Sequence, residues 1–268
     1  MEFINLSSTA STLLITLYSR AAMSKNNRIL EDKKAEEIIS LAGYDEKKLQ
    51  VSLKLQALLT LRAYIIDEYT KDFINRCDGD CTVIQLGCGL DSRYIRINNK
   101  KIKWYDLDLY GTMEMRKKYY KNSNNYKMIT SNVCNLSWFE EIETFDKPTL
   151  IIGEGLFMYL NEEENKLVIS EIAKKFKNCE FIFDIFSPLS VKFSRFAPSL
   201  RRVNANLKFG YKHPEKMEKM CNIKHLKTYY YYDCKKINDL PFFTRLRFKF
   251  RKTFGFFKKV QRIEIYKN

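Results

Sequence analysis

Two glycines and two acids occupy the positions in this chain that are best suited to chemistry. A short apolar run leads directly into Gly87-x-Gly89, and the next apolar run contains Asp106 and closes on Asp108. Because glycine has no Cβ, the backbone at this turn can approach a ligand closely. Carboxylates at the end of the following strand are placed to accept hydrogen bonds from ribose hydroxyls. The order strand, glycine turn, helix, strand, acid therefore predicts a nucleotide-binding crevice.

The glycine turn differs from a dinucleotide-binding turn at its third position. The NAD fingerprint places Gly or Ala three residues after the second glycine, and this chain has Ser92 there. The difference argues against a pyrophosphate at the start of the following helix, and so against NAD. A smaller nucleoside fits the two acids better.

An arginine lies on the apolar face of a predicted helix that precedes this turn. Between residues 49 and 73, Leu55, Leu58 and Ile65 share one helical face, and Arg62 lies in the middle of it. A guanidinium stays charged, so it must reach water or meet an anion. Two interpretations fit: a buried ion pair with Asp or Glu, or a bidentate contact with a ligand carboxylate beside the crevice.

Two more polar residues follow predicted strands of the same sheet. Asn132 comes after the third strand, where an amide can both accept from and donate to an adenine edge; the alternative is an ordinary turn residue. Glu154 ends the fourth strand, and acids at the carboxyl ends of parallel strands face the ligand crevice. The alternative for Glu154 is a loop or helix-start carboxylate.

The rest of the chain supplies the elements that must position these residues. Residues 1–75 are predicted to be helical, and from Cys81 onward strands and helices alternate, which favours parallel strands with right-handed crossovers. The predicted strands are Thr82–Leu86, Lys103–Leu107, Tyr126–Thr130, Thr149–Ile152 and Phe181–Ile185. Residues 161–164 resemble a capping box that opens a helix through Phe176. We therefore predict an α/β fold in a single domain, residues 1–268.

The last third of the chain has a different pattern. Residues 189–232 are basic and aromatic, and we predict an insertion that covers the top of the sheet and shapes the acceptor pocket. Charged and apolar residues alternate strictly in Arg245–Arg251 and again in Arg262–Tyr266. This period of two predicts two half-exposed strands that form an antiparallel pair.

Composition limits the classes of function. The formal net charge is +15, which fits nucleic acid, an anionic surface, an acidic substrate or simply solvated helix faces. Seven cysteines and two histidines lack the paired spacing of a zinc site and do not form a secreted disulfide framework. We therefore expect no metal and a cytoplasmic location. No apolar run is long enough for a membrane span or for a signal peptide.

Six separated segments carry a family resemblance. In chain order they read TLLITLYSRA, EDKKAEEI, LGCGLDSR, YDLDL, NVCNLSW and IIGEGLFMYLNEEE. Together they resemble the motifs of the leucine carboxyl methyltransferase family, nearest to its bacterial branch of polyketide-biosynthesis O-methyltransferases. The resemblance implies a class I methyltransferase dependent on S-adenosylmethionine (SAM), with a Rossmann-like sheet, helices on both faces, an N-terminal helical lid and an inserted cap.

The resemblance also assigns residues to the amino-acid end of SAM. Arg62 would bind the methionine carboxylate, and Gly87 and Gly89 would allow close approach of the methionyl moiety. Glu154 would be a further carboxylate on the cofactor side. The residue after the arginine is usually Thr in this family and is Ala63 here.

The resemblance assigns other residues to the adenosine end. Asp108 would bind the ribose hydroxyls, with Asp106 beside it. Asn132 and the backbone of Val133 would contact adenine. Relatives carry Asp at two positions where this chain has Asn132 and Asn135, so the site here has less negative charge.

Methyl transfer to a carboxylate would need holders of the substrate rather than a general base. A carboxylate is ionised at pH 7, so the lack of a Cys–His, Ser–His or paired-acid arrangement is expected. Tyr18 and Arg20 are predicted to close over the crevice as a lid, with Arg20 pairing with an acidic, small and polyketide-like acceptor. The alternative is a packed tyrosine and a structural arginine.

Two rival functions fit parts of the sequence. An RNA methyltransferase would use the net charge and the basic, aromatic residues 245–257 to follow phosphates. Against it, the basic residues of this run lie on one face of a predicted strand, which suits solvent exposure. A SAM-binding protein without transfer activity is the second rival. Binding to tRNA with steep salt dependence would support the first, and SAM binding without methyl transfer the second.

Overall fold

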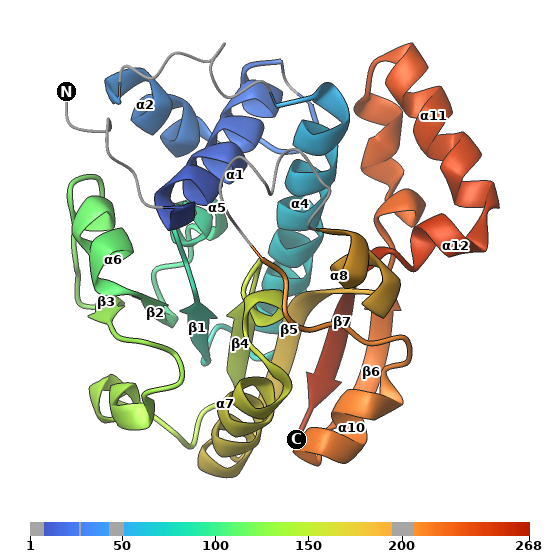
Figure 1. Ribbon diagram of the computed structural model, residues 1–268. Coiled ribbons are helices and arrows are strands. Elements are labelled where there is room, and N and C mark those ends of the chain that lie inside the picture. Colours follow the sequence, from blue (N-terminus) through green and yellow to red (C-terminus); the bar gives the residue numbers. More distant parts are fainter. Residues whose placement is uncertain (1–7, 27, 43–50, 195–205) are drawn as a thin grey trace.

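The computed structural model describes residues 8–26, 28–42, 51–194 and 206–268, and its centre is a seven-stranded sheet (Figure 1). The strands are β1 (Thr82–Leu86), β2 (Lys103–Asp108), β3 (Tyr126–Thr130), β4 (Thr149–Gly153), β5 (Cys179–Phe186), β6 (Lys224–Tyr229) and β7 (Gln261–Lys267). Their order is β3-β2-β1-β4-β5-β7-β6, with β1 to β5 parallel and β7 antiparallel to its two neighbours. The five predicted parallel strands are confirmed.

The order of the strands places a crevice at one end of the sheet. From β1 the chain adds strands outward to β3, then crosses back and adds β4 on the other side of β1. At such a reversal, parallel α/β sheets bind ligands outside the carboxyl ends of their strands. Gly87 follows β1 and Glu154 follows β4, so both residues lie at this crevice.

Helices cover both faces of the sheet (Figure 1). One face packs against α1 (Ser8–Lys25), α2 (Lys33–Leu41) and α4 (Leu53–Arg76), and the other against α7 (Glu162–Lys175) and α10 (Glu215–Cys221). Strand β1 serves both layers because successive side chains alternate, with Val83 in the first core and Ile84 in the second. Within the described residues no helix is long and apolar enough to cross a bilayer.

Polar side chains fix where several helices begin. The Asp32 carboxylate accepts the Ala35 N–H at the start of α2, and the Ser52 hydroxyl accepts the Leu55 N–H at the start of α4. The predicted capping box at residues 161–164 is confirmed, and α7 follows it. Short helices α5 (Arg93–Ile97) and α6 (Tyr110–Lys117) follow β1 and β2.

The predicted strand at Arg245–Arg251 is wrong, because this segment lies in α11 (Phe242–Thr253). The alternation is real, but Phe242, Leu246 and Phe250 also recur every four residues, which is the spacing of a helix face. In the helix Phe248 is buried, whereas Leu246 and Phe250, which would share its face in a strand, are exposed. The second alternating segment is confirmed as a strand and forms most of β7.

Part of the predicted insertion at residues 189–232 belongs to the sheet itself. It includes the end of α8 (Pro188–Ser194), α10 and the edge strand β6, while residues 195–205 lie outside the described part of the chain. Strand β6 pairs with β7, so it takes the place that the pattern assigned to residues 245–251.

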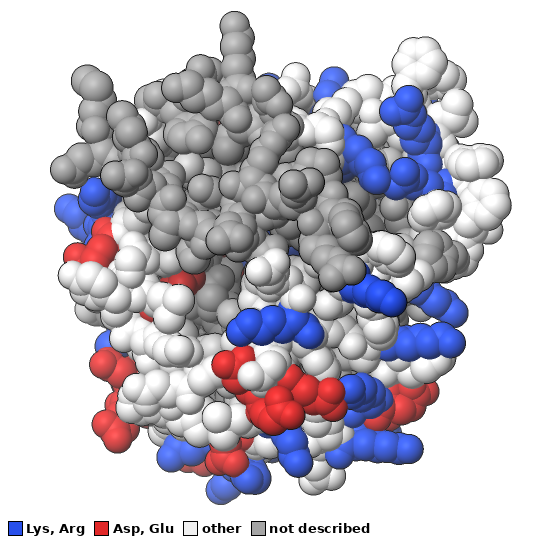
Figure 2. Space-filling model, viewed as in Figure 1, with Lys and Arg blue, Asp and Glu red and all other residues white. Residues whose placement is uncertain are grey.

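Surface charge is distributed unevenly over the face shown in Figure 2. Basic and acidic side chains are interspersed in the lower part of the view, over α7 and α10. At the upper right, over α11 and the short α12 (Gly255–Lys258), the charged side chains in view are basic and lie among uncharged ones. Part of the net positive charge of the chain therefore lies on α11 and α12.

Candidate cofactor and acceptor site

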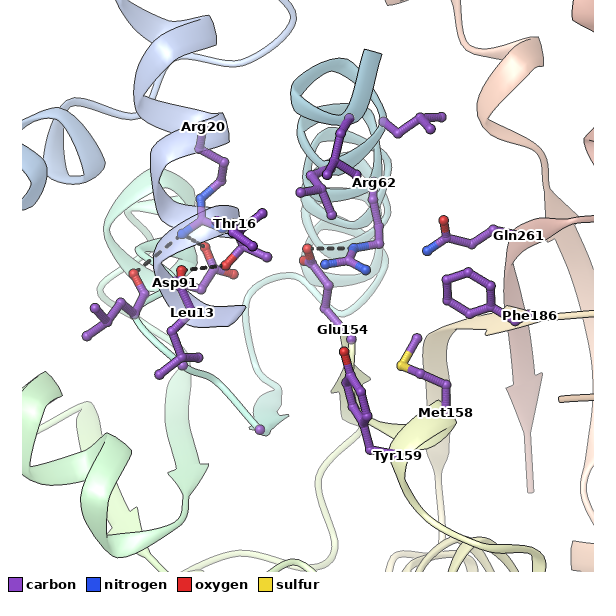
Figure 3. Close-up of a pocket in the computed structure, with 18 of the residues that line it drawn as sticks. Leu13, Thr16, Arg20, Arg62, Asp91, Glu154, Met158, Tyr159, Phe186 and Gln261 are labelled. Atoms are coloured by element: carbon purple, nitrogen blue, oxygen red, sulfur yellow. Dashed lines mark hydrogen bonds and ion pairs between the residues drawn. The ribbon is translucent and has the colours of Figure 1, made fainter. Parts of the chain in front are cut away.

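A cavity of about 430 Å³ lies at the carboxyl ends of β1 and β4, between α1 and α4 (Figure 3). This volume is in the range of small-molecule sites. Figure 3 shows Arg62 and Glu154 facing each other at its centre, with Arg20 and Asp91 on one side. An apolar wall is formed by Leu55, Leu58, Leu59, Met158, Tyr159, Phe186, Leu207 and Val260.

The predicted glycine turn lines this cavity. Gly87 and Gly89 have φ angles of +62° and +55°, a left-handed conformation that side chains rarely adopt. A Cβ on Gly89 would lie 2.7 Å from Leu13 Cδ2 of α1, so a larger residue would also have to shift that leucine side chain. The turn therefore needs glycine for its backbone conformation, and at Gly89 the Leu13 side chain also packs closely against it.

Asp108 holds the glycine turn from the end of β2. One carboxylate oxygen accepts the Gly89 N–H at 2.7 Å and the other accepts the Leu109 N–H at 2.7 Å. Burial raises the pKa of Asp108, although these two N–H donors act in the opposite direction. The residue is not part of the cavity lining, but it is in direct contact with the turn. Its role toward a ribose stays a prediction.

Asp106 has a different environment from Asp108. Its carboxylate is fully buried and accepts hydrogen bonds from Trp104 Nε1 at 2.8 Å, from Tyr126 Oη at 2.7 Å and from Arg116. Arg116 in turn donates to the Gly89 carbonyl at 2.9 Å. Asp106 does not line the cavity, and it supports the glycine turn through Arg116, whereas its position beside a bound ribose stays a prediction.

Arg62 lines the cavity and is also ion-paired. Its Nε donates to Glu154 Oε1 and its Nη1 donates to Asp184 Oδ2, both at 2.9 Å. Burial alone would lower the pKa of Arg62, but the two carboxylates raise it well above its ordinary value. Its Nη2 donates no hydrogen bond within the described residues and lies 3.3 Å from the position of a Cβ on Gly155. The ion-pair interpretation is confirmed, and a contact between Arg62 and a ligand carboxylate stays a prediction.

Glu154 is shared between two arginines. It accepts from Arg62 and, through its other oxygen, from Arg93 Nη2. Burial opposes ionisation, but the two guanidinium groups hold the pKa of Glu154 below its ordinary value. Glu154 is therefore more than an ordinary loop carboxylate, because it is a charged group that two arginines hold in the cavity.

A network of buried charges extends behind Glu154 to α5. Arg93 contacts Asp67 at 2.6 Å and Asp91 at 2.8 Å, and Arg96 contacts the same two acids at 2.7 and 2.8 Å. Asp91 is almost fully buried, but the surrounding arginines hold its pKa well below the ordinary value. These ion pairs fix α5 and the glycine turn against α4.

Arg20 belongs to this network, whereas Tyr18 does not line the cavity. The Arg20 guanidinium lines the cavity, and it lies 2.9 Å from Asp32 and 3.6 Å from Asp91. Tyr18 packs against the core between α1, α2 and α4. Both positions match the packed alternative more closely than a mobile lid, and contact of either residue with an acceptor stays a prediction.

Asn132 and Val133 lie apart from the cavity. The Asn132 side chain accepts the Cys134 N–H at 3.0 Å, as a turn residue does, and the Val133 carbonyl accepts from Trp138 Nε1 at 3.1 Å. Neither residue lines the cavity, which extends over the amino-acid end of the predicted cofactor site. Their contact with adenine stays a prediction.

Several charged site residues were not predicted from the sequence. They are Asp91, Arg93 and Arg96 after the glycine turn, Asp67 on α4 and Asp184 on β5. The clearest missed signal is Asp184, a single acid inside the otherwise apolar strand segment FIFDIF. A lone buried carboxylate requires a cation, and Arg62 on the facing helix is that cation.

Known proteins share both the sequence and the fold of this chain. Residues 13–173, more than half of the chain, match the family model for leucine carboxyl methyltransferases. The chain is 29% identical over 219 residues to the tetracenomycin polyketide synthesis O-methyltransferase TcmP of Streptomyces glaucescens, covering 81% of this chain and 80% of that protein. It is 26% identical over 200 residues to the S-adenosyl-L-methionine-dependent methyltransferase dpfgK of Gibberella zeae, with 68% and 67% covered.

Solved structures confirm the fold. A crystal structure described as a putative methyltransferase from Thermobifida fusca aligns with a TM-score of 0.57 at 13% identity and covers 92% of this chain and 93% of its own. The matches confirm the predicted class I fold, SAM as the cofactor and an O-methyltransferase activity. This chain belongs to the leucine carboxyl methyltransferase family.

Proposed function

We propose that this chain transfers the methyl group of SAM to a carboxylate oxygen of a small acceptor that has an apolar body. The observation that carries the proposal is the position of Arg62. Its Nε and Nη1 are fixed by Glu154 and Asp184, its Nη2 donates no hydrogen bond within the described residues, and the side chain lines the same cavity as the glycine turn. A guanidinium held in this way is preorganised to bind the carboxylate of an amino acid.

The charge of the site supports SAM as the ligand. The connected network contains four guanidinium groups and five carboxylates, which leaves one net negative charge. These residues are Arg20, Arg62, Arg93 and Arg96 with Asp32, Asp67, Asp91, Glu154 and Asp184. SAM carries an ammonium, a sulfonium and a carboxylate, so its net charge is positive and complements the network.

The chain's own residues act by binding and positioning. When bound, SAM supplies an electrophilic methyl carbon. Arg62 would hold its carboxylate, while the turn at Gly87 and Gly89 would bring the backbone against the methionyl chain. The apolar wall would exclude water and orient the acceptor, and such positioning supplies on the order of 7–11 kcal/mol of a transfer barrier.

The carboxylates, the thiol and the phenol that line the cavity do not supply a base, which favours a carboxylate acceptor over a hydroxyl. A hydroxyl must lose its proton to a base, but Asp91 and Glu154 are committed to ion pairs with arginines. Burial raises the pKa of Cys88 and of Tyr159, so both side chains stay protonated and cannot act as a base at neutral pH. A carboxylate is already ionised at pH 7 and needs no base.

Lys54 is the residue best placed to bind the acidic group of the acceptor. It lines the cavity from the first turn of α4, and no carboxylate in the described part of the chain pairs with it. Burial and the nearby Arg251 lower the pKa of Lys54 from its ordinary value. Since the guanidinium of Arg20 is held by Asp32, we assign the acceptor-binding role to Lys54 in place of Arg20.

A methyl-transfer screen tests this proposal. Purified protein is incubated with methyl-labelled SAM and matched pairs of aromatic acceptors that differ only in carrying a carboxylate or a phenolic hydroxyl. We expect methyl esters from the carboxylates and little product from the phenols. Transfer to the phenols alone would overturn the assignment of the acceptor, and SAM binding without transfer to any acceptor would support a non-catalytic protein.

A further inference from the structure

Helix α11 has two apolar faces, and only one of them is covered. Phe248 is buried in a core that includes Tyr232, whose ring centre lies 5.4 Å away. Four other apolar residues, Phe242, Phe243, Leu246 and Phe250, are exposed by 54 to 77%. At about 100° per residue these four fall within one arc of about 100°, on the side opposite Phe248. The helix therefore presents a continuous apolar stripe to solvent.

Basic residues border this stripe on both sides. Arg247 lies next to one edge of the arc and Lys249 next to the other, and both are exposed. The segment between residues 240 and 263 contains no Asp or Glu, whereas residues 245–259 contain seven Lys and Arg. Lys252 and Lys258 pair with Asp233 at the base of α11, but in the part of the chain that the structure describes no carboxylate reaches Arg247 or Lys249. Over α11, at the upper right of Figure 2, basic side chains lie among uncharged ones.

We propose that α11 lies on the surface of an anionic lipid bilayer, with its phenylalanine stripe at the boundary of headgroups and acyl chains. An exposed apolar stripe flanked by Lys and Arg is the arrangement of interfacial amphipathic helices. Each basic residue near an anionic surface adds attraction that falls with ionic strength. The lipid-binding face consists only of α11 and its short neighbour α12. We therefore expect the protein to bind the bilayer reversibly.

The charge of the face argues against other occupants. A second copy of this chain would bring two sets of unpaired basic residues together, and like charges oppose such a contact. Single-stranded RNA would need ring faces for its bases, but Leu246 at the centre of the stripe has none, and Phe242 and Phe243 are packed edge to face, 5.5 Å apart. A lipid interface accepts leucine and phenylalanine alike.

The lipid-binding face lies close to the proposed methyl-transfer site. The positive charge of Arg251 on α11 contributes to lowering the pKa of Lys54, and Lys54 lines the cavity. Val260, two residues after the end of α12, lines the same cavity. A bilayer in contact with α11 would thus lie next to the apolar wall of the cavity, where we expect an apolar acid to bind.

Co-sedimentation with vesicles tests the proposal. Full-length protein is mixed with vesicles of phosphatidylcholine alone or of phosphatidylcholine with phosphatidylglycerol, at low and high salt. We expect binding only to the anionic vesicles, with loss at high salt. The double variants Arg247→Glu/Lys249→Glu and Phe243→Ser/Phe250→Ser should each weaken binding by about tenfold or more. All four residues are exposed, so the thermal unfolding of both variants should match that of the wild type.

Matched controls separate the stripe from charge or apolarity in general. Lys174→Glu/Lys177→Glu changes the net charge equally on another surface, and Leu167→Ser removes an exposed apolar side chain from α7. Both controls should bind vesicles as the wild type does. The proposal is overturned if the α11 variants bind like the wild type, if the controls lose binding equally, or if the wild type binds single-stranded RNA but no anionic vesicles.

Discussion

Arginine serves two opposite purposes in the cavity and on α11. The arginines of the cavity and of the charge network behind it, such as Arg62 and Arg93, are buried, and each contacts at least two carboxylates. Arg247 on α11 is exposed, and no ion pair reaches it within the described residues. Burial therefore decides what an arginine does here. In the cavity, fold and ligand site depend on the same charges, whereas on α11 a charge can be removed without affecting the core.

The largest effect is expected for Arg93→Met. The substitution would leave Asp67, Asp91 and Glu154 buried without their shared cation, which costs on the order of 3–5 kcal/mol for a broken buried pair. Urea denaturation measures this change in the free energy of unfolding. A loss below about 1 kcal/mol would mean that the network is hydrated and contributes little.

The second effect separates SAM from its demethylated product, S-adenosylhomocysteine. Glu154→Gln keeps the shape of the side chain but removes one negative charge from the site. Since only SAM carries the sulfonium, we expect its affinity to fall by about tenfold more than that of the product, as measured by calorimetry. Glu180→Gln, which removes a carboxylate paired with Arg76 outside the cavity, should leave the ratio unchanged. An equal loss of both ligands in the Glu154 variant would assign that carboxylate a structural role only.

The third effect is the dependence of stability on pH. Asp32, Asp91 and Glu154 have folded-state pKa values below their ordinary values of 3.8, 3.8 and 4.5. Groups with lowered pKa values stabilise the fold above the ordinary values, and this contribution is lost as the pH falls through the folded-state values. We expect the free energy of unfolding to be nearly constant from pH 7 to about 5 and to fall steeply below about 4. A fall that begins above pH 5 would contradict the ion pairs.

The sequence predicted the sheet and the glycine turn, but it did not predict the charge network. Strands such as Thr82–Leu86 are short apolar runs bounded by turn residues, and that signal is local. Arg62 could be placed by its helical face, and an anion partner could be inferred. Its actual partners come from sequence separations of 92 and 122 residues, which no local pattern contains. For the same reason Asp106 and Asp108 were grouped, although only Asp108 reaches the turn.

A smaller effect concerns the acceptor. Lys54→Met should raise the KM of a carboxylate acceptor by about tenfold while stability and SAM affinity stay nearly unchanged, because one charged contact is removed. Lys71→Met is the control, since Lys71 lies on the same helix but does not line the cavity and is paired with Glu68. Steady-state kinetics that show equal KM values for Lys54→Met and the wild type would remove Lys54 from the acceptor site.

The smallest effect is expected on α11. Arg247→Met should change the free energy of unfolding by less than about 0.5 kcal/mol, as exposed substitutions usually do. Measured beside Arg93→Met in the same denaturation series, it gives the contrast between the two regions directly. Similar losses of unfolding free energy in the two variants would contradict the difference between the buried charge network and the exposed α11.

The central claim is that Arg62 binds the amino-acid end of the cofactor. Calorimetry with S-adenosylhomocysteine and with methylthioadenosine, which lacks that end, tests it on the wild type and on Arg62→Lys. We predict that the wild type prefers the former by about 10- to 100-fold, as one or two charge-assisted hydrogen bonds would give. In Arg62→Lys this preference should shrink while methylthioadenosine binds as before. Equal weakening of both ligands, or no change in either, would contradict the account.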